Sequence, residues 1–472
     1  MHRRVRKSAS SARVVAGWVF AVSLVASGSL AWDIAPASGE TLEDALAAAY
    51  LNNPRIHAQR ANLRTSDEDV SQAVSGWRPT ITVDADAGFS SVETVSNFGG
   101  GASTTTTDDL KPRSFTFTLS EPLYRGGRTV AETRSAENQV SAGRSTLNVT
   151  EQEVLLDAVT AYMDVLRSVA EVDLSRNNER VVARQFEAAQ DRFAVGEVTR
   201  TDVAQAEARL SQAKADRVAA EGDLISARAG YRLIMGDLPG TLVWPESAKD
   251  LPADERDSLV AGLRGNPAIF SADFAERAAR ENIDVALSDL LPEVALQARF
   301  NNQFDTSSFT EESETASLLA TVNIPLYQAG AGHSAVRQSK QVAAERRLNL
   351  EQARREVVEE VARAWEALIT AQARVSAFRS QVTASEIALD GVEQEAFVGL
   401  RTTLDVLDAE QELFEARVSL VRSQRDGIVS SYWLKASIGD LTASKLGLPV
   451  DLYDPAQHYD AVRDRLFGLG GD

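Results

Sequence analysis

The sequence of 472 residues contains no cysteine and only four histidines, and these shortages exclude several kinds of chemistry. Without cysteine, the chain has no disulfide, no thiolate metal site, no cysteine nucleophile and no N-terminal cysteine that could carry a lipid. The histidines are scattered along the chain, and neither a phosphate-binding glycine loop nor a nucleophile elbow is present. We therefore expect no catalytic site, no bound metal and no cofactor, and we do not expect an enzyme.

Long apolar runs are scarce as well, and the one near the N-terminus predicts a signal peptide over residues 1–37. Five basic residues precede an apolar run from about residue 14 to 30, and small residues offer cleavage sites after Ala31 or Ala37. Glycines and serines interrupt the run, which argues against an anchoring helix of about 20 apolar residues. No long apolar segment follows residue 40, so an exported chain of this kind is either soluble in the periplasm or a barrel of the outer membrane.

Basic residues are outnumbered by acidic ones. The first 37 residues hold five of the 49 basic and one of the 68 acidic residues, which leaves 44 and 67 and a net charge of −23. Nucleic-acid binding proteins carry basic patches, so this balance argues against a nucleic-acid partner.

The rest of the sequence contains an internal repeat. Asn53-Pro54 recurs 213 residues later as Asn266-Pro267, and the tripeptide Pro-Leu-Tyr at 122–124 recurs 203 residues later at 325–327. The change of offset places a difference of ten residues between these landmarks, as expected for a loop. We predict a first structural repeat over 38–240, a second over 241–441, and a C-terminal equatorial or tail segment over 442–472.

Each repeat contains long helical stretches. Residues 144–195 and 333–390 hold no glycine or proline, and the second stretch carries apolar residues at alternating steps of four and three. This heptad pattern is typical of coiled coils, and a helix of about 65 residues is about 100 Å long. The helical segments that we expect are 41–76, 128–194, 199–236, 254–290, 333–396 and 402–438.

Between helices, the segments 79–122 and 292–325 change to a period of two residues and predict β-hairpins. Apolar side chains alternate with polar ones, as in membrane barrel strands, although a small soluble β-domain on a coiled-coil stalk would show the same pattern. Four strands cannot close a barrel, whereas twelve strands from three chains can. The loops are rich in Gly, Ser, Thr and Asp, and we expect the longer one, between Ser90 and Lys111, to lie outside the cell. The alternating apolar positions include Ile81, Val83, Ala85, Phe115, Phe117, Leu119, Val294, Leu296, Ala298, Phe300, Ala320, Val322 and Ile324.

Two segments resemble the tip motifs of the TolC family: FAVGEVTRTDVAQAEARL at 193–210 and VGLRTTLDVLDA at 398–409. PLYRGG at 122–127 and Asn266-Pro267 also resemble family landmarks, and the likeness covers about residues 41–441. The resemblance implies an α+β membrane protein of two homologous halves. It implies a homotrimer whose twelve-stranded outer-membrane barrel, four strands per chain, lies in outer-membrane lipid and continues as a long α-helical coiled-coil tunnel in the periplasm. A periplasmic adaptor (membrane fusion) protein and an inner-membrane transporter would be its partners.

The resemblance also assigns roles to residues of the two motifs. Asp405 and Asp408 would form acidic rings at the periplasmic mouth, because residues three apart share one helix face and threefold symmetry would bring them to one axis. The solvated face of an acidic helix is the alternative for these two aspartates. Residues that match a latch of the closed state are Arg401, Thr201 and Asp202. Residues expected at the partner-docking tips are Val195, Gly196, Val398 and Gly399. A family tyrosine near the tip is missing, and Ala396 beside Phe397 holds its place.

The function expected from this resemblance is an exit duct that opens at its periplasmic tip when adaptor and transporter dock. Drug efflux and type I protein secretion stay open as cargo, because one channel can serve several pumps. A periplasmic structural or adaptor coiled coil without a pore is the alternative from another class, although an adaptor would be expected to carry one hairpin stalk.

Overall fold

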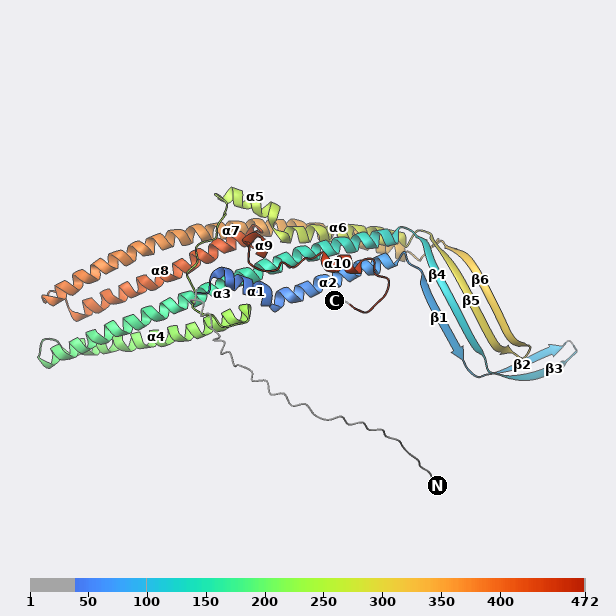
Figure 1. Cartoon of the computed structure of the whole chain (residues 1–472), viewed down its shortest axis with the longest axis horizontal. Coiled ribbons are helices and arrows are strands. Elements are labelled where there is room, and N and C mark those ends of the chain that lie inside the picture. Colours follow the sequence, from blue (N-terminus) through green and yellow to red (C-terminus); the bar gives the residue numbers. More distant parts are fainter. Residues whose placement is uncertain (1–38, 99, 471–472) are drawn as a thin grey trace, which may run out of the picture. The chain divides into compact units, whose positions relative to one another are not determined.

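The computed structural model describes residues 39–98 and 100–470, so the predicted signal peptide lies outside the described part of the chain. Helices and strands follow the order that Figure 1 labels. Their bounds are α1 (Leu42–Asn52), α2 (Pro54–Ser75), β1 (Thr80–Ala87), β2 (Ser90–Phe98), β3 (Ala102–Leu110), β4 (Arg113–Arg125), α3 (Arg128–Ala194), α4 (Arg200–Met235), α5 (Glu255–Gly265), α6 (Pro267–Ser288), β5 (Glu293–Ser307), β6 (Thr310–Asn323), α7 (Ala331–Phe397), α8 (Thr403–Ser437), α9 (Ala443–Leu446) and α10 (Gln457–Val462).

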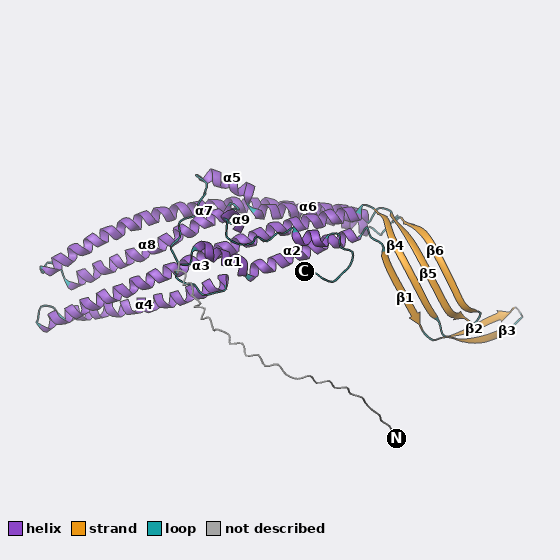
Figure 2. Ribbon diagram, in the orientation of Figure 1, coloured by secondary structure: helices purple, strands orange, loops and turns teal. Residues whose placement is uncertain are grey.

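Two helices of 67 residues, α3 and α7, are the longest elements, and each is about 100 Å long. The predicted helix over 128–194 coincides with α3, and the one over 333–396 agrees with α7 within two residues. Helix α4 runs back along α3, and α8 runs back along α7 (Figures 1 and 2). The heptad positions of α7 from Val357 to Ala371 are buried, whereas Val375 and Val382 are half-buried in the single chain. No helix in the described ranges is both long and apolar enough to cross a membrane.

The expectation of one continuous helix over 41–76 and another over 254–290 is wrong, because each is broken at its Asn-Pro pair. Proline disfavours the helical conformation of the preceding residue, and both Asn53 and Asn266 are extended, with ψ of 123° and 122°. The Asn53 side chain caps α2 by accepting from Arg55 N, and it donates to Ile234 O at the end of α4 (3.1 Å).

The second asparagine makes the corresponding contacts in the second half. Asn266 Oδ1 accepts from Ala268 N, and Asn266 Nδ2 donates to Ser437 O at the end of α8 (2.8 Å). Each break is therefore a joint that ties a short helix to the C-terminal end of α4 or α8, opposite the tip of the long hairpin.

Four antiparallel strands form one sheet in the order β1-β4-β5-β6. The register pairs apolar residues with apolar ones, as in Val83 with Phe117, and polar residues with polar ones, as in Asp84 with Thr116. The alternation predicted from the sequence thus separates the two faces of the sheet. A bulge between Pro122 and Tyr124 interrupts β4 near its C-terminal end, shortly before α3 begins.

The segment between Ser90 and Lys111, expected as a loop, instead forms a second two-stranded sheet from β2 and β3. Its strands are mostly polar on both faces, and Val92 and Val95 of β2 do not alternate regularly with polar residues, so a search for apolar alternation passes over them. Threonine is β-branched and favours strands all the same, and Thr104 to Thr107 lie in β3. The hairpin predicted over 292–325 is formed by β5 and β6, which are joined by a short turn between Ser307 and Thr310.

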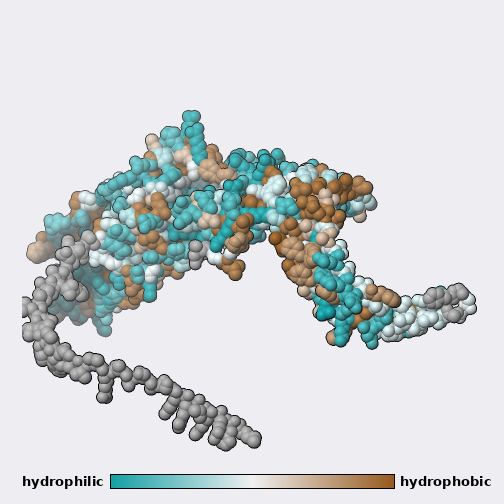
Figure 3. Space-filling view, turned by 45° about the vertical axis from the view of Figure 1, so that its right-hand side comes forward, coloured by the Kyte–Doolittle hydropathy of each residue, from teal (hydrophilic) through white to brown (hydrophobic). Residues whose placement is uncertain are grey.

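Exposed apolar residues gather where the sheet joins the helices, as the brown surface in Figure 3 shows. Trp77, Tyr124 and Tyr327 lie at this end of the strands, and all three are exposed. Such a belt is typical of the interface between lipid and water.

The C-terminal strap, which we define as residues 449–470, packs along α2 and α3. Tyr453 and Tyr459 contact an apolar cluster that includes Leu63, Val70 and Val140. The strap therefore extends the core beyond the last long helix.

Candidate functional site

Each long hairpin ends in a tight turn, between α3 and α4 and between α7 and α8. Gly196 and Gly399 hold these turns with φ of 85° and 79°, a left-handed conformation that favours glycine. Val195 and Val398 end the preceding helices, and both side chains are exposed, as are those of Phe397 and Leu400. The four residues expected at the tips therefore occupy equivalent positions in the two turns. Sequence reasoning did not single out Leu400, although its apolar side chain lies within the second tip motif.

Asp202 and Asp405 both lie in the first turn of the helix that follows the tight turn. The Asp202 carboxylate accepts from Thr199 N (2.8 Å), and the Asp405 carboxylate accepts from Thr402 N (2.8 Å). Each threonine hydroxyl accepts in return from the aspartate N–H, which completes a capping box. Hydrogen bonds from the threonine backbone and side chain lower the pKa of both carboxyl groups. The pattern Thr-x-x-Asp in the sequence is the signal for these caps. The roles predicted for the two aspartates, a latch and an acidic ring, did not take this pattern into account.

Arg401 pairs with Glu395 across the second turn, with Nε 2.8 Å from Oε2. This hydrogen bond raises the pKa of Arg401. Thr201 is exposed, and the described residues contain no ion pair between Arg401 and Asp202. One chain thus does not bring the expected latch residues together, so the latch stays a prediction for contacts between chains.

Asp408 makes an ion pair with Arg209 of α4, with Oδ1 2.6 Å from Nη2. Leu407, the preceding residue, is buried in a small cluster with Ala206 and Ala213 of α4. The first turns of α8 are therefore packed on α4 and linked to it by charge. Asp405 and Asp408, expected to act alike, have different partners.

Further along α8, two arginines contact acidic residues of α3. Arg422 Nε lies 2.9 Å from Glu171 Oε1, and Arg425 Nε lies 3.0 Å from Asp164 Oδ1. The Glu171 side chain is only 8% exposed, and Arg422 provides the opposite charge beside it. These pairs join residues about 250 positions apart in sequence, which is why charge patterns along single helices did not reveal them.

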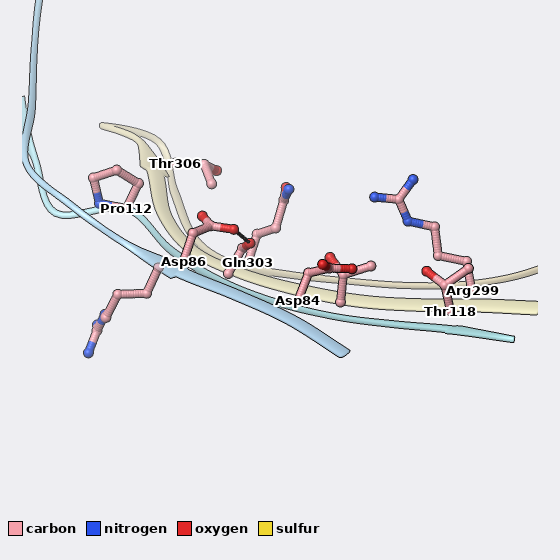
Figure 4. A pocket seen from close by; sticks show the side chains of 10 residues that line it. Asp84, Asp86, Pro112, Thr118, Arg299, Gln303 and Thr306 are labelled. Atoms are coloured by element: carbon pink, nitrogen blue, oxygen red, sulfur yellow. Dashed lines mark hydrogen bonds between the residues drawn. The ribbon is translucent and has the colours of Figure 1, made fainter. Parts of the chain in front are cut away.

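The polar face of the sheet carries charges of both signs around a hollow of about 490 Å³. Asp84 and Asp86 come from β1, and Arg299 comes from β5 (Figure 4). Ser114 donates to Asp86 at 2.6 Å. This face therefore suits water and ions rather than lipid. No cluster of three or more potential metal ligands is found in the described part of the chain.

Comparison with known proteins gives matches over most of the chain. The family described as "Outer membrane efflux protein" matches residues 45–237 and 260–440. Outer membrane efflux protein BepC of Brucella suis biovar 1 is 38% identical over 437 residues, which are 92% of this chain and 92% of that protein. Outer membrane protein TolC of Vibrio cholerae serotype O1 is 28% identical over 413 residues, 85% of this chain and 91% of that protein.

A solved structure, that of the Campylobacter jejuni CmeC outer membrane channel, has a similar fold. Its TM-score is 0.76, and the match covers 90% of this chain and 89% of that chain at 15% sequence identity. This likeness concerns the arrangement of helices and strands alone.

Proposed function

This chain belongs to the outer membrane efflux protein family, and we propose that three copies of it form the exit duct of an efflux pump or of a type I secretion system. The sheet spans the outer membrane and the helices form the periplasmic tunnel. The repeats are 38–240 and 241–441, with residues 442–472 as the C-terminal segment.

The four-stranded sheet is the observation that carries this proposal. Its outer strands, β1 and β6, each pair on one side only within the described residues, and an open edge is a site for pairing with another chain. Edge-to-edge pairing of three copies gives twelve strands, enough to close a barrel. The apolar face, including Ile81 and Val322, then meets lipid, and the polar face of Asp84 and Arg299 lines the pore.

The mass of the detergent-solubilised protein tests the assembly. We expect light scattering to give three chains and planar bilayers to show uniform conductance steps. A mass of one or two chains, or a protein released from cells without detergent, would contradict the proposal and favour a pore-free periplasmic coiled coil.

The exposed turns around Gly196 and Gly399 are the surfaces where the adaptor docks, with the inner-membrane transporter beyond it. Because the chain has no cysteine, single cysteines at Val195 and Val398 place a crosslinker at one site each. We expect crosslinks to the adaptor in cells from both positions and none from Leu466, an equally exposed position in the strap. Equal crosslinking from all three would refute docking at the tips.

Asp405 and Asp408 line the closed mouth, and Arg401 of one chain reaches Thr201 and Asp202 of the next. A Thr199 hydrogen bond uses one Asp202 oxygen, which leaves the other oxygen able to accept from a guanidinium. We expect Arg401→Ser to increase the open fraction in bilayers, with Arg374→Ser, an arginine lost elsewhere on the second hairpin, as the control. Equal open fractions in the two variants would contradict the latch.

A further inference from the structure

The two acidic residues of the candidate mouth have different electrostatic surroundings. Asp405 accepts hydrogen bonds from uncharged groups of Thr402, and the nearby cation, Arg401, makes its ion pair with Glu395 instead. Asp408 faces the guanidinium of Arg209 at 2.6 Å. The cation belongs to α4 of the first half, whereas the carboxylate belongs to α8 of the second.

Neither Arg209 nor Asp408 has an oppositely charged residue three or four positions away on its own helix. The positions three and four residues from Arg209 are occupied by Gln205, Ala206, Gln212 and Ala213, none of which is acidic. On α8, the corresponding neighbours of Asp408 include Asp405 and Glu412 and no basic residue. Residues three or four apart are the neighbours that meet on a helix, so the pairing across helices has no competitor within either helix.

Apolar packing holds the pair in place. Leu210 follows Arg209 and Leu407 precedes Asp408, and both leucines belong to the cluster formed with α3. The side chains of Arg209 and Asp408 are 40% and 54% exposed, so water and salt reach them. Such a pair adds little to folding, and its effect is on the charge of the surrounding surface.

We propose that Arg209 is a specificity-determining residue of the mouth, because it neutralises Asp408 and leaves Asp405 as the ring that attracts cations. This inference rests on the proposed trimeric channel. Each chain then contributes about one net negative charge at this level instead of two. A cation crossing the mouth meets a weaker field than the two acidic positions alone would suggest.

Ion selectivity in planar bilayers tests the inference through four proteins: wild type, Arg209→Gln, Asp408→Asn and the double variant. Counting charges per chain, Arg209→Gln has one more negative charge than wild type, Asp408→Asn has one fewer, and the double variant equals wild type. We expect the cation-over-anion permeability ratio, from the reversal potential in a KCl gradient, to rise at least about twofold for Arg209→Gln and to fall for Asp408→Asn. The double variant should return to the wild-type ratio.

Two further variants separate the pair from general effects. Arg217→Gln removes the same charge from α4, but Arg217 pairs with Glu179 and Glu221 within the first hairpin, so its ratio should stay near wild type. Arg209→Lys keeps the charge and should also behave as wild type. Light scattering must give the same trimer mass for every variant that is compared.

The outcomes distinguish this inference from the proposed function. If wild type forms no trimer and no conductance steps, the channel itself is refuted. If wild type conducts but the double variant matches Asp408→Asn and Arg209→Gln matches Arg217→Gln, then Arg209 does not act on the mouth and the inference alone is overturned.

Discussion

Removing the imidazole of His458 should loosen the C-terminal strap, because that ring is the hydrogen-bonding partner of a buried carboxylate. His458 Nδ1 lies 3.0 Å from Asp67 Oδ2, and the Asp67 side chain is fully buried while His458 is 16% exposed. Burial raises the pKa of Asp67, and the hydrogen bond from His458 opposes this shift. His458→Ala therefore leaves a buried carboxylate without its partner.

The size of the effect follows from the two sides of this contact. Breaking a fully buried charged pair costs about 3–5 kcal/mol. His458 is partly exposed and the strap can detach from the helices, so the value for one hydrogen bond to a charged group, about 2 kcal/mol, is the better guide. This value corresponds to about a 30-fold larger opening constant for the strap, since about 1.4 kcal/mol is tenfold.

Hydrogen exchange of the amides in the strap measures this opening. The amide of Tyr453, which donates to the Tyr50 hydroxyl, is a suitable reporter. We expect exchange to be about 30-fold faster in His458→Ala and unchanged in His333→Ala, which removes an exposed histidine of α7.

Neutralising Asp67 should restore part of the protection. The amide of Asp67→Asn carries no charge that burial penalises, so the double variant with His458→Ala should exchange more slowly than His458→Ala alone. Equal exchange in these two variants would show that the buried charge is not what His458 compensates.

Three further predictions follow from the turns, the caps and the ribbon. Gly196→Ala and Gly399→Ala should each destabilise their turn by about 1 kcal/mol, because alanine disfavours positive φ, and faster proteolysis at the substituted tip would show it. The lowered pKa of Asp405 means that its capping contribution is present above the unfolded pKa of about 3.9 and is lost only as pH falls through the lower folded value, so cation selectivity should persist to about pH 4. Thr402→Ala should move this loss to higher pH, and an unchanged pH profile would argue against the cap as its cause. An epitope inserted after Gly100, in the open turn between β2 and β3, should be reachable by antibody on intact cells, and labelling only after permeabilisation would contradict the topology.

Helix lengths were predictable from the sequence, whereas contacts between distant segments were not. Stretches without glycine or proline and a recurring offset of 203 residues located α3 and α7, because these signals are local and occur twice. The two Asn-Pro pairs were recognised in the sequence as repeat landmarks. Their structural role depends on hydrogen bonds to carbonyl groups such as Ile234 O, which another helix supplies.

Charge partners at the candidate mouth escaped prediction for the same reason. Arg209 and Asp408 are 199 residues apart, and their pairing depends on how α4 packs against α8. The β2–β3 ribbon escaped because alternation of apolar and polar residues is absent when water reaches both faces of a strand.

The asparagine joints have a mechanical consequence for the long hairpins. Helix α4 has 36 residues and is therefore a rod of about 54 Å, attached near its base to Asn53. A tilt of about 5° at that base carries the far end through about 5 Å, while the hydrogen-bonding groups at the joint shift by only fractions of an ångström. Such a tilt would therefore move the tips at Gly196 and Gly399 much farther than the joints at Asn53 and Asn266, which lie at the opposite ends of the long hairpins.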